Sequence, residues 1–308
     1  MSLNNRLPWN TAWITGAGRG IGAELTRLLC SHGVTVYGSA RTTEQLHQLQ
    51  QELSNTTGKL IPVPLDIRDP DAVQQLFIEW DRQNFMPDLV VLNAGSHDPF
   101  SAYEFSAQRC KDLLDINLQG TINCLDPVLY RYLHRSEYGP DYGPDYGPDY
   151  GPEDKSESGS ERQPETLKAV SLNPVAKRTL TGTRQIAVVS SSAGYRGLPT
   201  AAAYGAGKAA LINLCESLRL DLQGSGVKLQ LINPGFVRTP LTDKNEFSMP
   251  ALMEPDEAAR RIVKGLLSDR FEIVFPRRFV YLLKLFRLLP YNVYFWLIGK
   301  ATGASKDE

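Results

Sequence analysis

Tyr204 and Lys208 are the residues whose types and spacing most directly suggest chemistry. Residues four apart share one face of a helix, so the lysine ammonium would stand beside the tyrosine phenol. A nearby positive charge favours the phenolate and lowers the tyrosine pKa from its ordinary value of about 10. Such a tyrosine is a general acid and base for interconverting a carbonyl and an alcohol. The pair follows three serines, Ser190–Ser192, at the end of an expected strand.

A glycine-rich segment, TGAGRGIG at Thr15–Gly22, follows another expected strand. Its glycines would let the backbone turn sharply and approach a pyrophosphate, whose charge the amino end of the next helix would meet. The spacing of Gly16, Gly20 and Gly22 is not the Gly-x-Gly-x-x-Gly of two-domain dehydrogenases, and such turns also arise for packing reasons. The segment therefore favours dinucleotide binding, with a packing turn as the alternative.

Arg41 and Arg19 indicate which dinucleotide would bind. NAD sites usually place an acid about twenty residues beyond the glycines to hold the ribose 2′-hydroxyl, whereas NADP sites use arginine. Here the second expected strand leads to Arg41 with no acid before Glu44, and Arg19 lies within the glycine loop. Both arginines could contact a 2′-phosphate. The sequence therefore predicts NADP(H), with two solvated surface arginines as the alternative.

Short β-branched runs alternate with helical periodicity, which predicts an α/β fold: a Rossmann-like, doubly wound parallel sheet of about seven strands. The expected strands are Ala12–Thr15, Val34–Ser39, Leu60–Pro64, Leu89–Asn93, Ile186–Ser191, Lys228–Ile232 and Glu272–Phe275. The expected helices lie near Gly20–His32, Thr43–Leu53, Asp71–Asn84, Gln108–His134, Tyr204–Leu222 and Pro255–Ser268. Pro127 should kink or divide the fourth of these helices.

The composition, with 42% hydrophobic and 22% charged residues among 308, indicates an ordinary globular chain with one sizeable core. A net charge of -1 provides no global field for nucleic acid. The four cysteines are widely spaced and no signal peptide is visible, which favours the cytoplasm. No metal site is expected, because no pairing pattern joins the histidines, which are His32, His47, His97 and His134.

We expect a single catalytic, dinucleotide-binding domain over residues 8–275 and an apolar helical extension over residues 276–308. A low-complexity insertion at 137–183 interrupts the domain, and within it Tyr-Gly-Pro-Asp repeats from Tyr138. Repeated Gly-Pro without apolar periodicity is typical of a turn-rich or disordered surface loop. A tolerated insertion and a partner-binding segment are the two interpretations.

The extension is strongly apolar over residues 277–300, yet a membrane-spanning helix needs about twenty residues with few charges. Arg277, Lys284 and Arg287 fall near one face of a helix whose other face is apolar, and Pro290 starts a second segment. A pair of helices packed on the domain, as lid or oligomer contact, is favoured. A peripheral membrane contact through an amphipathic segment is the main alternative, ahead of a transmembrane helix.

Seven segments, in order, resemble the short-chain dehydrogenase/reductase family, in the subgroup with a Thr-Gly-x-x-x-Gly-Ile-Gly loop and a Tyr-x-x-x-Lys helix. The segments are TGAGRGIG at Thr15–Gly22, LDI at Leu65–Ile67, LNAG at Leu92–Gly95, DINLQG at Asp115–Gly120, SSSAG at Ser190–Gly194, YGAGK at Tyr204–Lys208 and NPGFVRTP at Asn233–Pro240. The resemblance implies the doubly wound fold, NAD(P) binding, a small-molecule substrate and a homo-oligomer.

The resemblance also implies roles for four catalytic residues. Tyr204 would donate the proton to a substrate carbonyl, and Lys208 would bind the nicotinamide ribose and lower the pKa of Tyr204. Ser191 would hydrogen-bond the substrate oxygen, and Asn117 would hold the water that links Lys208 to solvent. The structural alternatives are a serine that satisfies backbone groups at a strand end and an asparagine that caps a helix.

For the cofactor, the resemblance implies contacts along the carboxyl edge of the sheet. Asp66 and Ile67 would meet the adenine, and Pro234-Gly235 with Thr239 would fix the carboxamide, with hydride leaving the pro-S face. The full set of implied cofactor residues is Gly16, Arg19, Gly20, Ile21, Gly22, Arg41, Asp66, Ile67, Asn93, Ala94, Gly95, Lys208, Pro234, Gly235 and Thr239.

The expected function is therefore an NADP(H)-dependent oxidoreductase that interconverts a carbonyl and a secondary alcohol, running as a carbonyl reductase on an apolar compound. The loop between Phe236 and Met253 would close over the substrate pocket. A non-catalytic nucleotide sensor or scaffold is the alternative, because a fold alone does not decide function. The intact set of proton-relay residues favours the enzyme.

Overall fold

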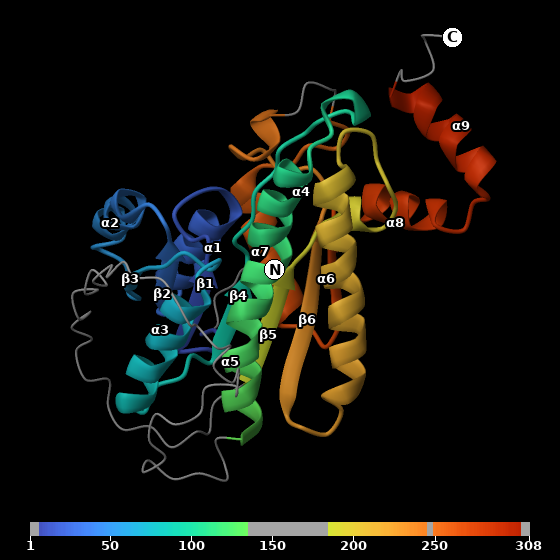
Figure 1. Cartoon of the computed structure of the whole chain (residues 1–308). Helices are drawn as coiled ribbons and strands as arrows, with labels where there is room; N and C mark the ends of the chain where they lie inside the picture. The colour runs from blue at the N-terminus through green and yellow to red at the C-terminus, as the bar shows by residue number, and fades with distance from the viewer. Residues whose placement is uncertain (1–5, 135–183, 245–248, 303–308) are drawn as a thin grey trace, which may run out of the picture.

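The computed structural model describes residues 6–134, 184–244 and 249–302, whose arrangement Figure 1 shows. Seven parallel strands form one sheet in the order β3-β2-β1-β4-β5-β6-β7. Helices cover both faces of the sheet, so the predicted doubly wound α/β fold is confirmed. The insertion at 137–183, with its Tyr-Gly-Pro-Asp repeat, lies outside the described residues.

The elements match the expected ranges to within two residues, except for one helix discussed below. The strands are β1 (Thr11–Thr15), β2 (Thr35–Ala40), β3 (Leu60–Pro64), β4 (Leu89–Leu92), β5 (Arg184–Val189), β6 (Val227–Pro234) and β7 (Glu272–Phe275). The helices are α1 (Gly20–Ser31), α2 (Thr43–Glu52), α3 (Pro70–Arg82), α4 (Ala107–Leu114), α5 (Gly120–His134), α6 (Ala202–Asp221), α7 (Pro255–Leu266), α8 (Arg277–Phe286) and α9 (Tyr291–Thr302).

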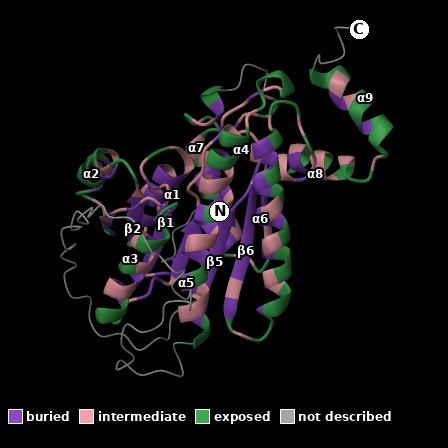
Figure 2. Ribbon diagram, viewed as in Figure 1, coloured by how far each residue is buried: buried purple, intermediate pink, exposed green. Residues whose placement is uncertain are grey.

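Alternating strand residues fill two cores, one on each face of the sheet. In β1, Ala12 and Ile14 belong to the core under α1, α2 and α7, whereas Trp13 belongs to the core under α3, α5 and α6. Trp13 packs edge to face against Phe77 and Trp80, with ring centres 5.4 Å apart in each pair. Figure 2 shows the buried strands between the helical layers. Strands that are buried on both faces consist of continuous apolar residues, which is why these strands could be predicted from the sequence.

The strand order places a crevice at the carboxyl edge of the sheet. From β1 the chain builds β2 and β3 on one side, and then β4 to β7 on the other. The loops that follow β1 and β4 therefore leave the sheet in opposite directions. Open α/β sheets bind ligands at such a reversal of strand order.

The helix predicted over Gln108–His134 is divided, but not at Pro127. A π turn at Asp115–Gln119 separates α4 from α5, and α5 continues through Pro127. Within the π turn, Asn117 Nδ2 donates to the Leu113 carbonyl at 2.9 Å. The prediction at Pro127 is therefore wrong about the place of the break, because the widened turn comes ten residues earlier.

The C-terminal extension forms two helices on either side of Pro290, as predicted, and α9 projects from the body of the molecule (Figure 1). No helix in the described part of the chain is long and apolar enough to cross a bilayer. The predicted basic face of α8 needs one correction. Lys284 turns inward and forms an ion pair with Glu272 on β7, because a half-buried carboxylate requires a charged partner.

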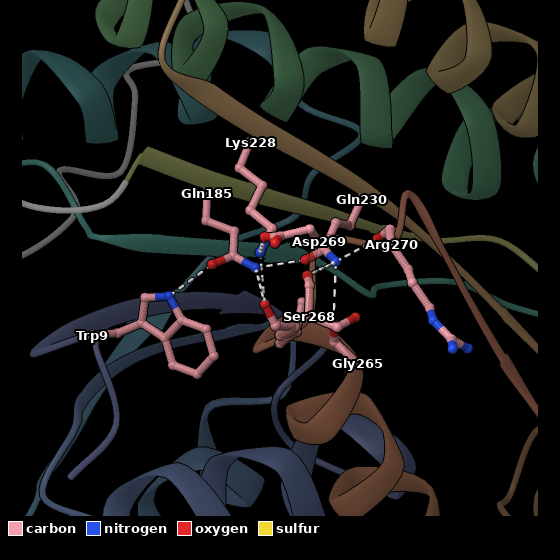
Figure 3. Close-up of polar contacts among 9 residues, drawn as sticks. Trp9, Gln185, Lys228, Gln230, Gly265, Ser268, Asp269 and Arg270 are labelled. Carbon is pink, nitrogen blue, oxygen red and sulfur yellow. Dashed lines mark hydrogen bonds and ion pairs between the residues drawn. The ribbon is translucent and has the colours of Figure 1, made fainter.

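A buried polar network joins elements at the opposite, amino edge of the sheet (Figure 3). Gln185 accepts a hydrogen bond from Trp9 Nε1 at 2.9 Å and donates one to Gln230 Oε1 at 2.6 Å. The two glutamine side chains also donate to the carbonyls of Gly265 and Leu266 at the end of α7. These bonds satisfy carbonyls that a helix end leaves unpaired.

Candidate active site

α6 brings the predicted acid-base pair to the carboxyl edge of the sheet, beside the end of β5. Tyr204 and Lys208 lie one turn apart, and Lys208 Nζ is 5.8 Å from the centre of the Tyr204 ring. The lysine is only 3% exposed and donates a hydrogen bond to the Val189 carbonyl oxygen at 3.0 Å. The structure therefore brings the two side chains together as the spacing predicts.

The pKa values of the pair differ from the expectation. Burial raises the pKa of Tyr204, and a hydrogen bond with the Ser191 hydroxyl opposes that rise. Burial lowers the pKa of Lys208 to about 8. The predicted lowering of the Tyr204 pKa is thus wrong for the protein by itself, because desolvation of a phenolate outweighs the groups that favour it. The phenol keeps its proton, which is the state that a proton donor needs.

Lys208 makes folding stability depend on pH. Its folded pKa of about 8 is below the unfolded value of 10.5. As the pH rises through this window, the folded state loses its proton first, so the unfolded state binds more protons and stability rises. Between pH 7 and pH 10, we expect the free energy of unfolding of the wild type to increase by about 2 kcal/mol relative to that of Lys208→Met, which has no lysine at this position. Denaturant melts of both proteins measure this; parallel pH curves would contradict it.

Ser190 and Ser191, which follow β5, have different surroundings. Ser191 precedes a short 3₁₀ turn (Ser192–Gly194), accepts a hydrogen bond from the Ala193 amide at 3.1 Å, and faces the Tyr204 hydroxyl. Ser190 is buried and donates to the Lys208 carbonyl at 2.8 Å, which ties α6 to the end of β5. Ser191 is therefore the serine that lies beside the phenol.

Asn117 is buried at the π turn and holds the loop that follows β4. Its Nδ2 donates to the Ser96 carbonyl at 2.9 Å, and its Oδ1 accepts from the Ser96 amide at 3.1 Å. A Cβ atom added to Gly95 would lie 2.8 Å from Asn117 Oδ1 and 3.6 Å from Lys208 Nζ. Asn117, Gly95 and Lys208 are thus neighbours, and the asparagine does not act as a helix cap.

His97 contacts the site, although no role for it was predicted from the sequence. Its ring packs edge to face against the Tyr204 ring, with centres 4.7 Å apart. The His97 carbonyl accepts a hydrogen bond from Lys244 Nζ at 2.7 Å. The only signal in the sequence is its position two residues after the LNAG segment, at the carboxyl end of β4.

A cleft of about 300 Å³ lies at the reversal of strand order. Two of its lining residues connect it to this site: Ser96 bonds Asn117, and the Cβ position of Gly95 lies 3.6 Å from Lys208 Nζ. Most of the predicted cofactor residues line it: Gly16, Arg19, Gly20, Ile21, Arg41, Asp66, Ile67, Asn93, Ala94, Gly95 and Thr239. Sequence reasoning missed further lining residues, among them Ser39, Thr42, Gln45, Ser96 and Leu241. Gly22, Lys208, Pro234 and Gly235 were predicted to bind cofactor but do not line this cleft.

The glycine turn fits a dinucleotide because nothing larger than hydrogen fits at key positions. Gly16 has a φ of +69°, and a Cβ atom there would lie 2.8 Å from Ala94 Cα. Gly20, with a φ of +57°, opens α1 at the edge of the cleft. Helix amino ends with exposed backbone amides favour phosphate. The donor set and the turn are therefore suited to a pyrophosphate.

Two arginines give one part of the cleft a positive charge. Arg19 and Arg41 are exposed and line it. Asp66 is the acid among its described lining residues, and Arg68 forms an ion pair with it at 2.6 Å. The hydrogen bond from Arg68 is the main cause of the lowered Asp66 pKa, to which Arg41 also contributes.

Gly22 packs inside the turn instead of facing the cleft. A Cβ atom there would lie 2.1 Å from the Gly16 carbonyl oxygen and 2.7 Å from Asn93 Nδ2. We expect Gly22→Ala to lower Tm by about 3–10 °C, since overpacking typically costs about 1–3 kcal/mol. Gly197→Ala is the control, because no atom lies within 4 Å of its added Cβ. Thermal melts measure both variants, and an equal Tm would contradict the packing role.

Pro234 pairs with Phe275 of β7, and Gly235 lies against the C-terminal extension. The Gly235 amide donates to the Phe275 carbonyl at 2.7 Å, and its Cβ position faces Pro276 and Phe279. The extension also contacts the segment just after Ser191. Tyr195 donates from its hydroxyl to Glu272 at 2.7 Å, and the same carboxylate pairs with Lys284 of α8. Sequence reasoning missed this connection between α8 and the site.

Comparisons with known proteins agree with this geometry. A family model described as short chain dehydrogenase matches residues 10–139 and 176–249. A protein of Myxococcus xanthus described as an uncharacterized oxidoreductase is 31% identical over 284 residues, which are 92% of this chain and 94% of that protein. An NADPH-dependent pterin aldehyde reductase of Arabidopsis thaliana is 33% identical over 137 residues, or 44% of this chain and 56% of its own length.

Solved structures share the fold. A short-chain dehydrogenase from Sphingobium yanoikuyae, in complex with NADPH, superposes with a TM-score of 0.65 and 20% identity. The alignment covers 98% of this chain and 96% of that chain. The arrangement of strands, helices and extension is thus one that occurs in other proteins.

Proposed function

Because the chain belongs to the short-chain dehydrogenase family of oxidoreductases, we propose that it is an NADP(H)-dependent carbonyl reductase. The observation that carries the proposal is the contact of Tyr204 with Ser191, beside buried Lys208 and next to the cleft. A neutral phenol facing a second hydroxyl can hold and protonate one oxygen atom. A nucleotide sensor would need the cleft but not this pair.

The proposed reaction divides the work among the residues of this chain. When bound, the reduced nicotinamide supplies a hydride to the carbonyl carbon. Ser191 Oγ donates a hydrogen bond that holds the substrate oxygen, and Tyr204 gives its proton to that oxygen. Lys208 holds a positive charge beside the phenol, so the phenolate that remains is stabilised. Asn117 would position the water that returns a proton through Lys208.

The choice of NADP(H) rests on Arg19 and Arg41 at the mouth of the cleft. Two guanidinium groups can form charge-assisted hydrogen bonds with a 2′-phosphate, which a ribose hydroxyl cannot match. The NADPH-dependent relative from Arabidopsis thaliana and the NADPH complex from Sphingobium yanoikuyae support this choice. We also propose that Asp66 and Ile67 contact the adenine.

The substrate we propose is an apolar aldehyde or ketone. His97 packs on Tyr204, and residues 236–244 follow β6 close to the cleft. Both His97 and this segment would therefore contact the substrate. The resemblance implies a homo-oligomer, and the spacing of the cysteines favours the cytoplasm; we retain both properties as predictions. The single domain over residues 8–275 likewise stays a prediction.

Two measurements on the purified protein test the function. Fluorescence titration gives the Kd values of NADPH and NADH, and absorbance at the nicotinamide band follows oxidation of NADPH with aldehydes, ketones and 3-oxoacyl thioesters. We expect tighter binding of NADPH and turnover of at least one carbonyl class. Tight NADPH binding without turnover of any carbonyl would favour the nucleotide sensor instead.

A further inference from the structure

The C-terminal helix pair, α8 with α9, exposes an unusual amount of apolar surface. Of the thirteen exposed large hydrophobic residues in the described part of the chain, seven lie in these two helices and an eighth, Leu288, lies between them. On α8, the exposed face carries Tyr281, Leu282 and Leu285, and Leu288 follows it with 80% of its area exposed. Figure 2 shows how much of this pair is exposed. A patch of this kind marks an interaction surface.

Aromatic residues dominate the exposed side of α9. Tyr291 and Phe295 stack one turn apart, with ring centres 5.8 Å apart, and both are more than half exposed. Trp296 is 63% exposed, and Lys300 Nζ lies 5.4 Å from the centre of its ring. Tyrosine and tryptophan have an apolar ring and a polar atom, which suits the boundary between hydrocarbon and water.

The charge of this surface has one sign. Between Ile273 and Thr302 the sequence contains five lysine or arginine residues and no aspartate or glutamate. Lys284 is paired with Glu272, but the other four are exposed around the apolar patch: Arg277, Arg278, Arg287 and Lys300. The remainder of the chain must therefore be acidic, since the whole protein has a net charge of -1.

The helix pair is firmly joined to the catalytic domain. Arg196 donates to the carbonyls of Phe286 and Leu289, and its guanidinium lies 4.0 Å from the centre of the Tyr294 ring. The Tyr294 hydroxyl donates to the Gly197 carbonyl. Because these contacts use the inner side of the pair, the exposed aromatic and basic side chains are presented outward.

We propose that the C-terminal helix pair docks on the surface of a membrane rich in anionic phospholipids. The apolar rings and leucines would enter the acyl boundary, and the four exposed cations would pair with lipid phosphates. A second copy of this chain is a poorer occupant. A symmetric dimer through this surface would set the same cations against one another, with no acid between Ile273 and Thr302 to neutralise them.

Trp296 provides a direct test, because the other three tryptophans, Trp9, Trp13 and Trp80, are buried. Vesicles of brominated phosphatidylcholine mixed with phosphatidylglycerol should quench the exposed tryptophan and shift its emission to the blue. Trp296→Phe should abolish both changes, since the buried rings lie out of reach of the bromines. No quenching, or equal quenching by brominated phosphatidylcholine alone, would overturn the proposal.

Sedimentation with the same anionic vesicles separates the electrostatic and the apolar contributions to membrane binding. We expect Arg277→Glu with Arg278→Glu to weaken binding by about tenfold or more, since each basic residue near the surface contributes about 1 kcal/mol. Leu285→Ser with Phe295→Ser should weaken it similarly. The matched controls, Arg82→Glu with Lys264→Glu and Leu220→Ser, change exposed residues of other helices and should bind like the wild type.

A second copy as occupant has its own signature in solution. Without vesicles, acrylamide should quench Trp296 equally at all protein concentrations. Protection that grows with concentration, and that is lost in Leu285→Ser with Phe295→Ser, would show self-association through this surface and overturn the membrane proposal.

Discussion

Tyr204→Phe should lower kcat/KM for carbonyl reduction by about a thousandfold, since a positioned general acid contributes about 10²–10⁴ to the rate. The phenol is the group that donates the proton, and Phe keeps the ring contact with His97 while removing that proton. The Kd of NADPH should stay within about twofold, because the ring is retained and the hydroxyl lies beside Ser191. Steady-state kinetics and nucleotide titration measure the two quantities.

Tyr132→Phe is the matched control for this loss. The Tyr132 hydroxyl is also buried and donates to the Pro87 carbonyl at 2.6 Å, but it lies away from the cleft. Its removal should lower Tm with little change in kcat. If Tyr204→Phe instead retained more than a tenth of wild-type turnover, the assignment of Tyr204 as the acid would be wrong.

Arg41→Asp should reverse the preference between the two nucleotides. The change removes a charge-assisted contact and places a carboxylate beside the 2′-phosphate, so the Kd of NADPH should rise by about a hundredfold or more. NADH has a hydroxyl there, and the new carboxylate can accept its proton, so its Kd should fall or stay unchanged. Titration of both nucleotides with wild type and variant measures the switch.

Arg82→Asp controls for a general loss of positive charge. Arg82 is exposed at the end of α3 and pairs with Glu79, outside the cleft. It should leave both Kd values unchanged. Equal weakening of NADPH and NADH by Arg41→Asp would mean that Arg41 does not face the 2′-phosphate.

The fold could be predicted to the level of its elements because burial on both sheet faces makes strands such as Leu89–Leu92 uniformly apolar. The break near Asn117 could not, since a π turn has no composition of its own and Pro127 gave a stronger but misleading signal. At this turn the Asn117 side chain donates to the backbone carbonyls of Leu113 and Ser96, and the second of these lies on the loop after β4, which only the folded chain brings near.

In the candidate site, the contacts between residues close together in the sequence could be predicted. Helical spacing alone places Lys208 beside Tyr204, and the strand end places Ser191 nearby. The direction of the Tyr204 pKa shift was missed, because burial by distant segments is invisible in a five-residue pattern. Long-range partners such as His97 on Tyr204 and Lys284 on Glu272 were missed for the same reason.

The two edges of the sheet differ in how well they tolerate changes in the length of the connecting chain. α5 ends at His134 and β5 begins at Arg184, both at the amino edge of the parallel sheet and therefore remote from Tyr204 at its carboxyl edge. The length of the chain at that junction can therefore change without an effect on turnover. For protein engineering, the same junction is the natural position for new chain termini or a grafted reporter.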